Sequence, residues 1–121
     1  MVEVDKLWQE AIREHNAGEY HEAHEIFEDL WLELDNRKEK DTVQTLAQAD
    51  ALAVHLKTGN LRAAQRLMRQ LPELVQNFPE SYRNIDLREM GSWIRHMIAS
   101  IPPFGEINNI SKEEPPNLIH G

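Results

Sequence analysis

The chain contains no cysteine among its 121 residues. This absence excludes a disulfide framework, a thiolate metal site and a cysteine nucleophile. Long apolar runs are also missing, since no stretch approaches the roughly 18 residues that a membrane-spanning helix needs. The first residues include Glu3 and Asp5 and do not resemble a signal peptide. We therefore expect a cytoplasmic protein with no membrane partner.

Positive charge is the other scarce property of the chain. Thirteen Lys and Arg residues stand against twenty-one Asp and Glu residues, which gives a formal net charge of −8. A surface this acidic repels phosphate groups, so we do not expect a nucleic-acid partner. The chain length suits a single domain with one hydrophobic core.

Apolar residues recur at helical spacing in five segments, and no segment alternates in the manner of a strand. Pro72 should kink or break the fourth segment, because proline removes a backbone donor and clashes with the preceding turn. The five predicted helices cover residues 5–16, 19–34, 41–58, 60–77 and 86–101. The sequence therefore predicts an all-α fold, a single-domain bundle of about five helices.

The order of these segments suggests two packed αα-hairpins of tetratricopeptide-like form. Residues 16–23 resemble residues 57–64, and each set places a glycine turn between two helices. Four of the six prolines follow residue 101. We therefore divide the chain into a helical bundle domain, residues 1–101, and a proline-rich tail, residues 102–121. The apolar residues of the tail predict that it packs on the bundle or on a partner.

The densest chemistry lies in residues 18–31, which hold two histidines, five carboxylates and three aromatic rings. On a helical wheel most of these side chains divide between a core face and a narrow polar arc. His24, Glu28 and Trp31 lie on adjoining turns, and His24 is at the border between the two. On the next predicted helix, a roughly shared stripe holds three further polar residues: Gln44, Gln48 and His55.

The same residues resemble a known family, catalogued as domain of unknown function 309. The hallmark of that family is the pattern H-x-x-x-E-x-x-W, which here falls on His24, Glu28 and Trp31. The resemblance extends over roughly residues 8 to 98. Its further matches are Gln44 and Gln48, His55, Gly59-Asn60, Ala64 and Ile85-Asp86-Leu87. The resemblance implies a compact helical bundle and no established activity, and Asp50 departs from the usual small or apolar residue.

Four interpretations of these residues remain open from the sequence. Glu28 can accept hydrogen bonds from His24 and the Trp31 indole, as a satisfied polar network at the edge of the core. His24, Glu28 and His55 can instead bind a divalent metal such as zinc or iron. His24 and Glu28 can also serve as an acid–base pair for a small polar ligand. Finally, the two hairpins can form an interaction module for a second copy or a peptide.

From these alternatives we predict a small acidic intracellular binding or interaction module. Its polar pocket would be lined by the six residues His24, Glu28, Trp31, Gln44, Gln48 and His55. The alternative is a metal-dependent enzyme, hydrolytic or redox, that uses His24, Glu28 and His55. The sequence leaves open whether the protein catalyses a reaction.

Overall fold

The computed structural model describes residues 3–107, 110 and 112–121. Residues 1, 2, 108, 109 and 111 belong to the predicted bundle and tail ranges and lie outside the described residues. The helices are α1 Glu3–Asn16, α2 Tyr20–Glu33, α3 Arg37–Thr58, α4 Leu61–Leu67, α5 Leu71–Val75 and α6 Arg88–Ser100. Three two-residue strands accompany them, β1 Ser81–Tyr82, β2 Ile85–Asp86 and β3 Ile119–His120. The prediction of an all-α helical bundle is confirmed, with a small sheet that the sequence did not predict.

The central element is α3, which contacts α2, α4 and α5. Its start lies earlier than predicted, because Asn36 caps the helix and its side chain accepts a hydrogen bond from the Glu39 amide at 3.1 Å. A capped amide removes one unsatisfied donor from the first turn, and this favours a start after Asn36 over the predicted start at residue 41. The helix ends at Gly59, whose φ of 76° is the left-handed conformation that glycine adopts without strain.

The predicted fourth helix is divided in two, as Pro72 suggested. α4 ends at Leu67, a turn follows, and α5 begins at Leu71 with Pro72 in its first turn, where a missing amide proton costs nothing. Asn60 caps α4 by accepting from the Ala63 amide at 3.2 Å. The break redirects the chain so that α5 contacts both α3 and α6.

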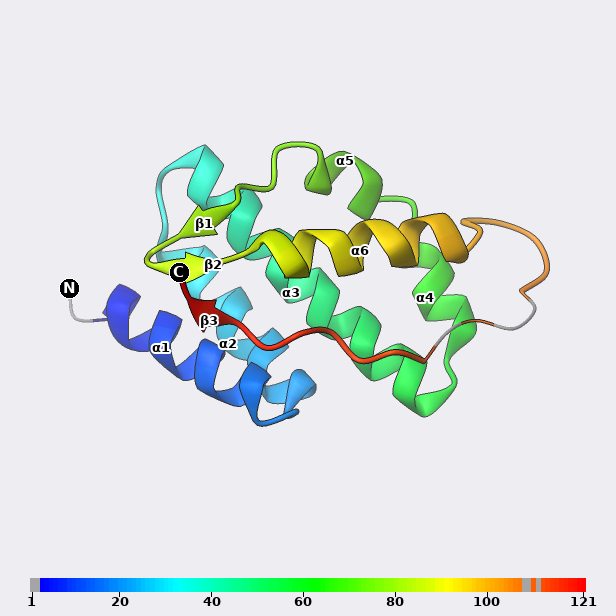
Figure 1. Cartoon of the computed structure of the whole chain (residues 1–121), viewed down its shortest axis with the longest axis horizontal. Helices are drawn as coiled ribbons and strands as arrows, with labels where there is room; N and C mark the ends of the chain where they lie inside the picture. The colour runs from blue at the N-terminus through cyan, green and yellow to red at the C-terminus, as the bar shows by residue number, and fades with distance from the viewer. Residues whose placement is uncertain (1–2, 108–109, 111) are drawn as a thin grey trace.

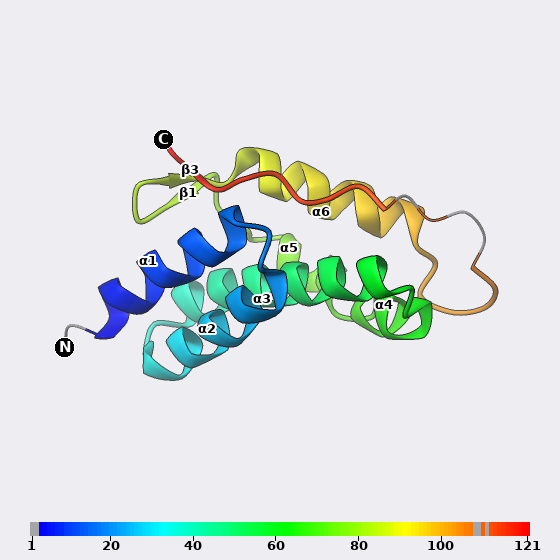
Figure 2. The ribbon, with the colours of Figure 1, turned by 90° about the horizontal axis from the view of Figure 1, so that it is seen from below.

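The tail packs on its own bundle and ends in the sheet. Figures 1 and 2 show it running back along α6 toward the start of that helix. Its last strand completes the antiparallel order β1-β2-β3, in which Ile85 lies opposite His120. Asn16 at the end of α1 binds both backbone groups of Leu118, at 2.8 Å to the carbonyl and 2.7 Å from the amide. The Leu118 side chain is 2% exposed and belongs to the core.

The core extends through all six helices, and no helix among the described residues is long and apolar enough to cross a membrane. The fully buried side chains of α2 and α3 that meet at its centre include Phe27, Leu30, Leu46 and Leu52. Because the core occupies one side of α2, the polar arc of that helix is left at the surface beside α3.

Candidate functional site

A pocket of about 470 Å³ lies between α2, α3 and α4. This volume is within the range of pockets that bind small molecules. Five of the six residues that the sequence predicted for a pocket line it: His24, Glu28, Trp31, Gln44 and Gln48. The remaining lining residues are Asp29, Leu32, Ala47, Ala51 and Leu67. The α2 and α3 helices therefore bring the predicted polar groups together at one hollow.

His24 is fixed in the pocket wall by its first ring nitrogen. Nδ1 donates to the Ala47 carbonyl at 2.7 Å, and a carbonyl can only accept, so the proton is on Nδ1. Nε2 is then the ring nitrogen left for another partner. It lies 3.3 Å from the Glu28 carboxylate one turn further along the helix. Because a carboxylate also accepts, this contact is a hydrogen bond only when the imidazole is protonated.

Two buried polar atoms of the pocket residues have no hydrogen-bond partner within the described part of the chain. They are Nε1 of Trp31, which can only donate, and Oε1 of Gln48, which can only accept. The Gln48 amide nitrogen is occupied, because it donates to the Gln70 side chain at 2.6 Å. One face of the Trp31 ring is also occupied, by the Lys40 ammonium at 3.8 Å from the ring centre. The expected satisfied network, in which Glu28 accepts from the Trp31 indole, is therefore not formed.

His55 does not join the other predicted site residues. It follows Ala47 by eight residues on α3, a rise of about 12 Å along the helix axis. Burial lowers the pKa of His55 most, and the charges of Arg66 and His24 lower it further. Among the described residues, no group of three or more His, Cys, Asp or Glu side chains is arranged to hold a metal ion. The predicted divalent-metal set of His24, Glu28 and His55 is therefore not assembled.

A second polar cluster, which the sequence did not predict, lies behind the pocket in the core. His15 of α1 and Asp50 of α3 are 1% and 0% exposed, and Nδ1 lies 2.6 Å from Oδ1. The other ring nitrogen, Nε2, lies 2.8 Å from the Pro116 carbonyl of the tail. Since that carbonyl accepts, Nε2 carries a proton, and a second proton is held between Nδ1 and Asp50. The cluster thus binds α1, α3 and the tail together.

The pKa values of both members of this pair are raised. For His15, burial lowers the pKa, but the hydrogen bond and charge of Asp50 and the bond to Pro116 together outweigh it. For Asp50, burial raises the pKa more than the bond and charge of His15 and the charge of His24 lower it. The only sequence signal of this pair was Asp50 itself, which stands where a small or apolar residue is usual. The pairing was not visible, because the two residues are 35 positions apart.

We expect the free energy of unfolding to fall as pH rises from about 6 to about 9. Both pKa values are raised, so the folded state holds more protons than the unfolded chain above the ordinary histidine pKa of 6.5. The stabilisation is complete below 6.5 and is lost as pH rises through the raised pKa of His15. Urea unfolding at both pH values measures the effect. The Asp50→Asn variant is the control, because its amide can donate to Nδ1 without titrating, and an equal pH slope in that variant would refute the assignment.

Comparison with known proteins places these elements in a family. Residues 8–67 match the family described as Domain of unknown function (DUF309). The chain belongs to this family. The matched range contains α2, α3 and every residue of the pocket, and it ends before Ile85-Asp86-Leu87. Within this DUF309 protein, the part that carries the pocket is thus the part that the family shares.

A relative from Aquifex aeolicus (strain VF5), described as an uncharacterized protein, is 29% identical over 96 residues. The alignment covers 78% of this DUF309 chain and 28% of the relative. The chain therefore spans about a quarter of the relative's length. No solved structure matches the chain.

Proposed function

We propose that the pocket between α2, α3 and α4 binds a small neutral molecule that carries a hydrogen-bond donor beside an acceptor, such as a primary carboxamide. The observation that supports this most is the pair of buried atoms, Trp31 Nε1 and Gln48 Oε1, that lack hydrogen-bond partners in the described part of the chain. A buried donor or acceptor without a partner costs about 1–3 kcal/mol. A ligand with an acceptor for the indole and a donor for the amide oxygen removes both costs.

The charges around the pocket favour a neutral or cationic ligand over an anionic one. Glu28 and Asp29 line the pocket, and among the described residues no Lys or Arg side chain does so. Apolar contact comes from Leu32, Ala51 and Leu67, which suits a carboxamide attached to a small ring or alkyl group. His24 adds one further group, since its Nε2 accepts from a donor in the neutral form and donates when protonated.

We propose binding as the function of this pocket, and not metal-dependent catalysis. That alternative required His55 beside His24 and Glu28, and His55 lies outside the lining of the pocket. His24 and Glu28 both line the pocket, as an acid–base pair would require. The pocket residues do not indicate which chemical group of a substrate such a pair would act on. Binding is the function that the arrangement of donors and acceptors supports best.

We expect acetamide and nicotinamide to shift the indole N–H signal of Trp31 in nitrogen–proton correlation spectra of the labelled protein. The Trp93 indole provides an internal control, because its N–H already donates to the Glu113 carbonyl at 3.1 Å. The carboxylates acetate and nicotinate should shift the Trp31 signal far less, because Glu28 and Asp29 repel them. Trp31→Phe assigns the signal, and the near-isosteric Gln48→Met should weaken binding roughly 5–100-fold by removing the acceptor.

Three results would contradict the proposal. One is an unchanged Trp31 signal at saturating carboxamide concentrations. Another is an equal response to carboxamide and carboxylate, which would show that the donor–acceptor pair is not recognised. The third is undiminished binding by Gln48→Met when circular dichroism shows that the variant is folded.

A further inference from the structure

Charge is distributed unevenly along this acidic chain. Residues 1–36 hold eleven Asp and Glu residues against two Lys and Arg residues. Residues 51–72 hold no acidic residue and four basic ones, namely Lys57, Arg62, Arg66 and Arg69. The chain therefore has one strongly negative segment and one positive segment in spite of its overall negative charge.

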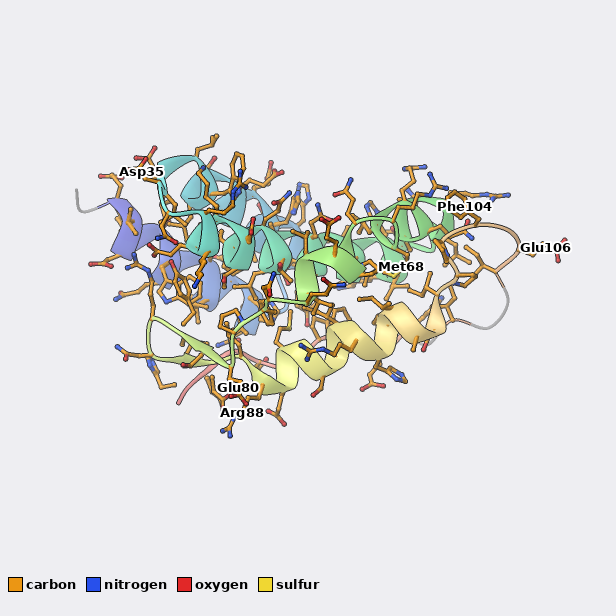
Figure 3. The ribbon with its side chains drawn as sticks, turned by 90° about the horizontal axis from the view of Figure 1, so that it is seen from above. Asp35, Met68, Glu80, Arg88, Phe104 and Glu106 are labelled. Carbon is orange, nitrogen blue, oxygen red and sulfur yellow. The ribbon has the colours of Figure 1, made fainter. Side chains whose placement is uncertain are left out.

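The fold places these two segments at opposite ends of the molecule. Figure 1 shows α1 and α2 at one end of the long axis and α4 at the other. In Figure 3, Asp35 beyond the end of α2 and Phe104 beside α4 lie at opposite ends of one long edge. Both α2 and α4 pack on α3, and Leu67 of α4 shares the pocket lining with residues of α2. Negative α2 and positive α4 thus border the pocket from two sides.

On α4 and the turn after it, Arg62, Arg66 and Arg69 form a row that we call the arginine stripe. All three are exposed, and no ion pair within the described residues joins any of them to a carboxylate. The Arg69 guanidinium lies 4.3 Å from the ring centre of Phe104, which is 68% exposed. The buried Gln65 fixes this loop by donating to the carbonyls of Pro102 and Gly105. Arg62 also donates to the Gln65 side chain at 3.4 Å, and Arg69 donates to the Pro103 carbonyl at 3.3 Å. The stripe is therefore a set of cations that lack a carboxylate partner among the described residues, beside a positioned aromatic ring.

On α2, Glu22, Glu25 and Asp29 form a second exposed row, the acidic stripe. Within the described residues Glu22 and Asp29 make no ion pair, and Glu25 has only the contact of 3.4 Å with His21. The arginine stripe has the spacing i, i+4, i+7, and the acidic stripe has the same spacing when α2 is followed in the reverse direction. On α2 and on α4, side chains at such spacings lie on one side of the helix, and the turn after α4 carries Arg69 beyond the end of that helix. An antiparallel pairing would therefore place Arg62 opposite Asp29, Arg66 opposite Glu25 and Arg69 opposite Glu22.

We propose that the arginine stripe binds the acidic stripe of a second copy of this chain, in a symmetric antiparallel dimer. A twofold axis that relates α2 of one copy to α4 of the other makes this contact twice and closes the assembly. Two exposed large hydrophobic residues, Leu32 at 67% and Phe104 at 68%, lie at the ends of the two stripes. They add apolar area to a contact whose orientation is set by charge.

A second copy fits the arginine stripe better than a polyanion such as nucleic acid does. The net charge of −8 and the eleven carboxylates of residues 1–36 repel a long phosphate chain. In a second copy of the chain, the same carboxylates are the groups that the arginine stripe binds. Exposed ion pairs each add little to affinity, so the dimer should be weak, rapidly reversible and sensitive to salt.

The mass from sedimentation velocity at high protein concentration tests this proposal. We expect dimers in about 0.1 M salt and monomers in about 1 M salt, as the screening length falls from about 10 to about 3 Å. Arg62→Glu with Arg66→Glu, and separately Glu25→Arg with Asp29→Arg, should each give monomers, because each variant opposes like charges. An equimolar mixture of the two variants should restore dimers, since both contacts of the heterodimer are then complementary.

Lys6→Glu with Arg13→Glu is the control for net charge. It changes the charge by the same amount as the arginine variant, at exposed positions outside both stripes, and it should leave the dimer intact. A wild-type chain that stays monomeric at low salt, or a mixture of variants that stays monomeric, would overturn the proposal. Binding of a short single-stranded DNA probe that is lost in the arginine variant would assign the stripe to a polyanion and also overturn it.

Discussion

Replacing Asp50 by Ala is expected to lower the free energy of unfolding by about 3–5 kcal/mol, the usual effect of removing one partner from a buried ion pair. The carboxylate is fully buried, and its Oδ1 lies 2.6 Å from His15 Nδ1. Without Asp50, His15 keeps its proton on Nε2 for the Pro116 carbonyl and leaves Nδ1 buried without a partner. Equilibrium unfolding in urea measures the loss.

The matched variant Asp50→Asn separates the hydrogen bond from the charge. Its side chain has nearly the same shape, and its amide can donate to Nδ1 while Nε2 continues to donate to Pro116. We expect it to lose much less stability than the alanine variant. If both variants lose the same amount, or if the alanine variant loses less than about 1 kcal/mol, the pair does not connect α1, α3 and the tail as described.

Leu118→Ala is expected to cost about 2–5 kcal/mol, the range measured for truncation of a buried leucine. Leu118 is 2% exposed, although only three residues of the sequence follow it. The adjacent residue provides the control, because Ile119 is 53% exposed and its truncation should change stability by about 0.5 kcal/mol or less. Thermal and urea unfolding of the two variants measure the difference. Similar small losses in both would show that the tail is not part of the folded core.

The helices could be predicted from the sequence because local signals specify them. Apolar spacing indicates each buried face, and Gly18 and Gly59 end helices where a positive φ is required. Pro72 divided the fourth segment for a reason that is equally local. The first turn of α3 was missed, because the predicted helix began at residue 41 and the cap at Asn36 lies before that range.

The features that were not predicted depend on residues far apart in the sequence. The strands are two residues long, too short for alternation to be visible, and β3 joins the sheet from the other end of the chain. Five of the six predicted pocket residues line one hollow, since His24 and Glu28 are one turn apart and Gln44 and Gln48 share a stripe. His55 does not line that hollow, because spacing along a helix does not show how far a neighbouring helix extends beside it.

The contacts of the tail with α1 also determine the order in which the molecule can fold. His15 and Pro116 are 101 residues apart, and Asn16 and Leu118 are 102 apart. Closing so long a loop has a high entropic cost, so contacts of this kind form late in folding. The pair of His15 and Asp50 needs only the first three helices. During synthesis, Nε2 of His15 therefore stays without its partner, the Pro116 carbonyl, until nearly the whole chain has been made.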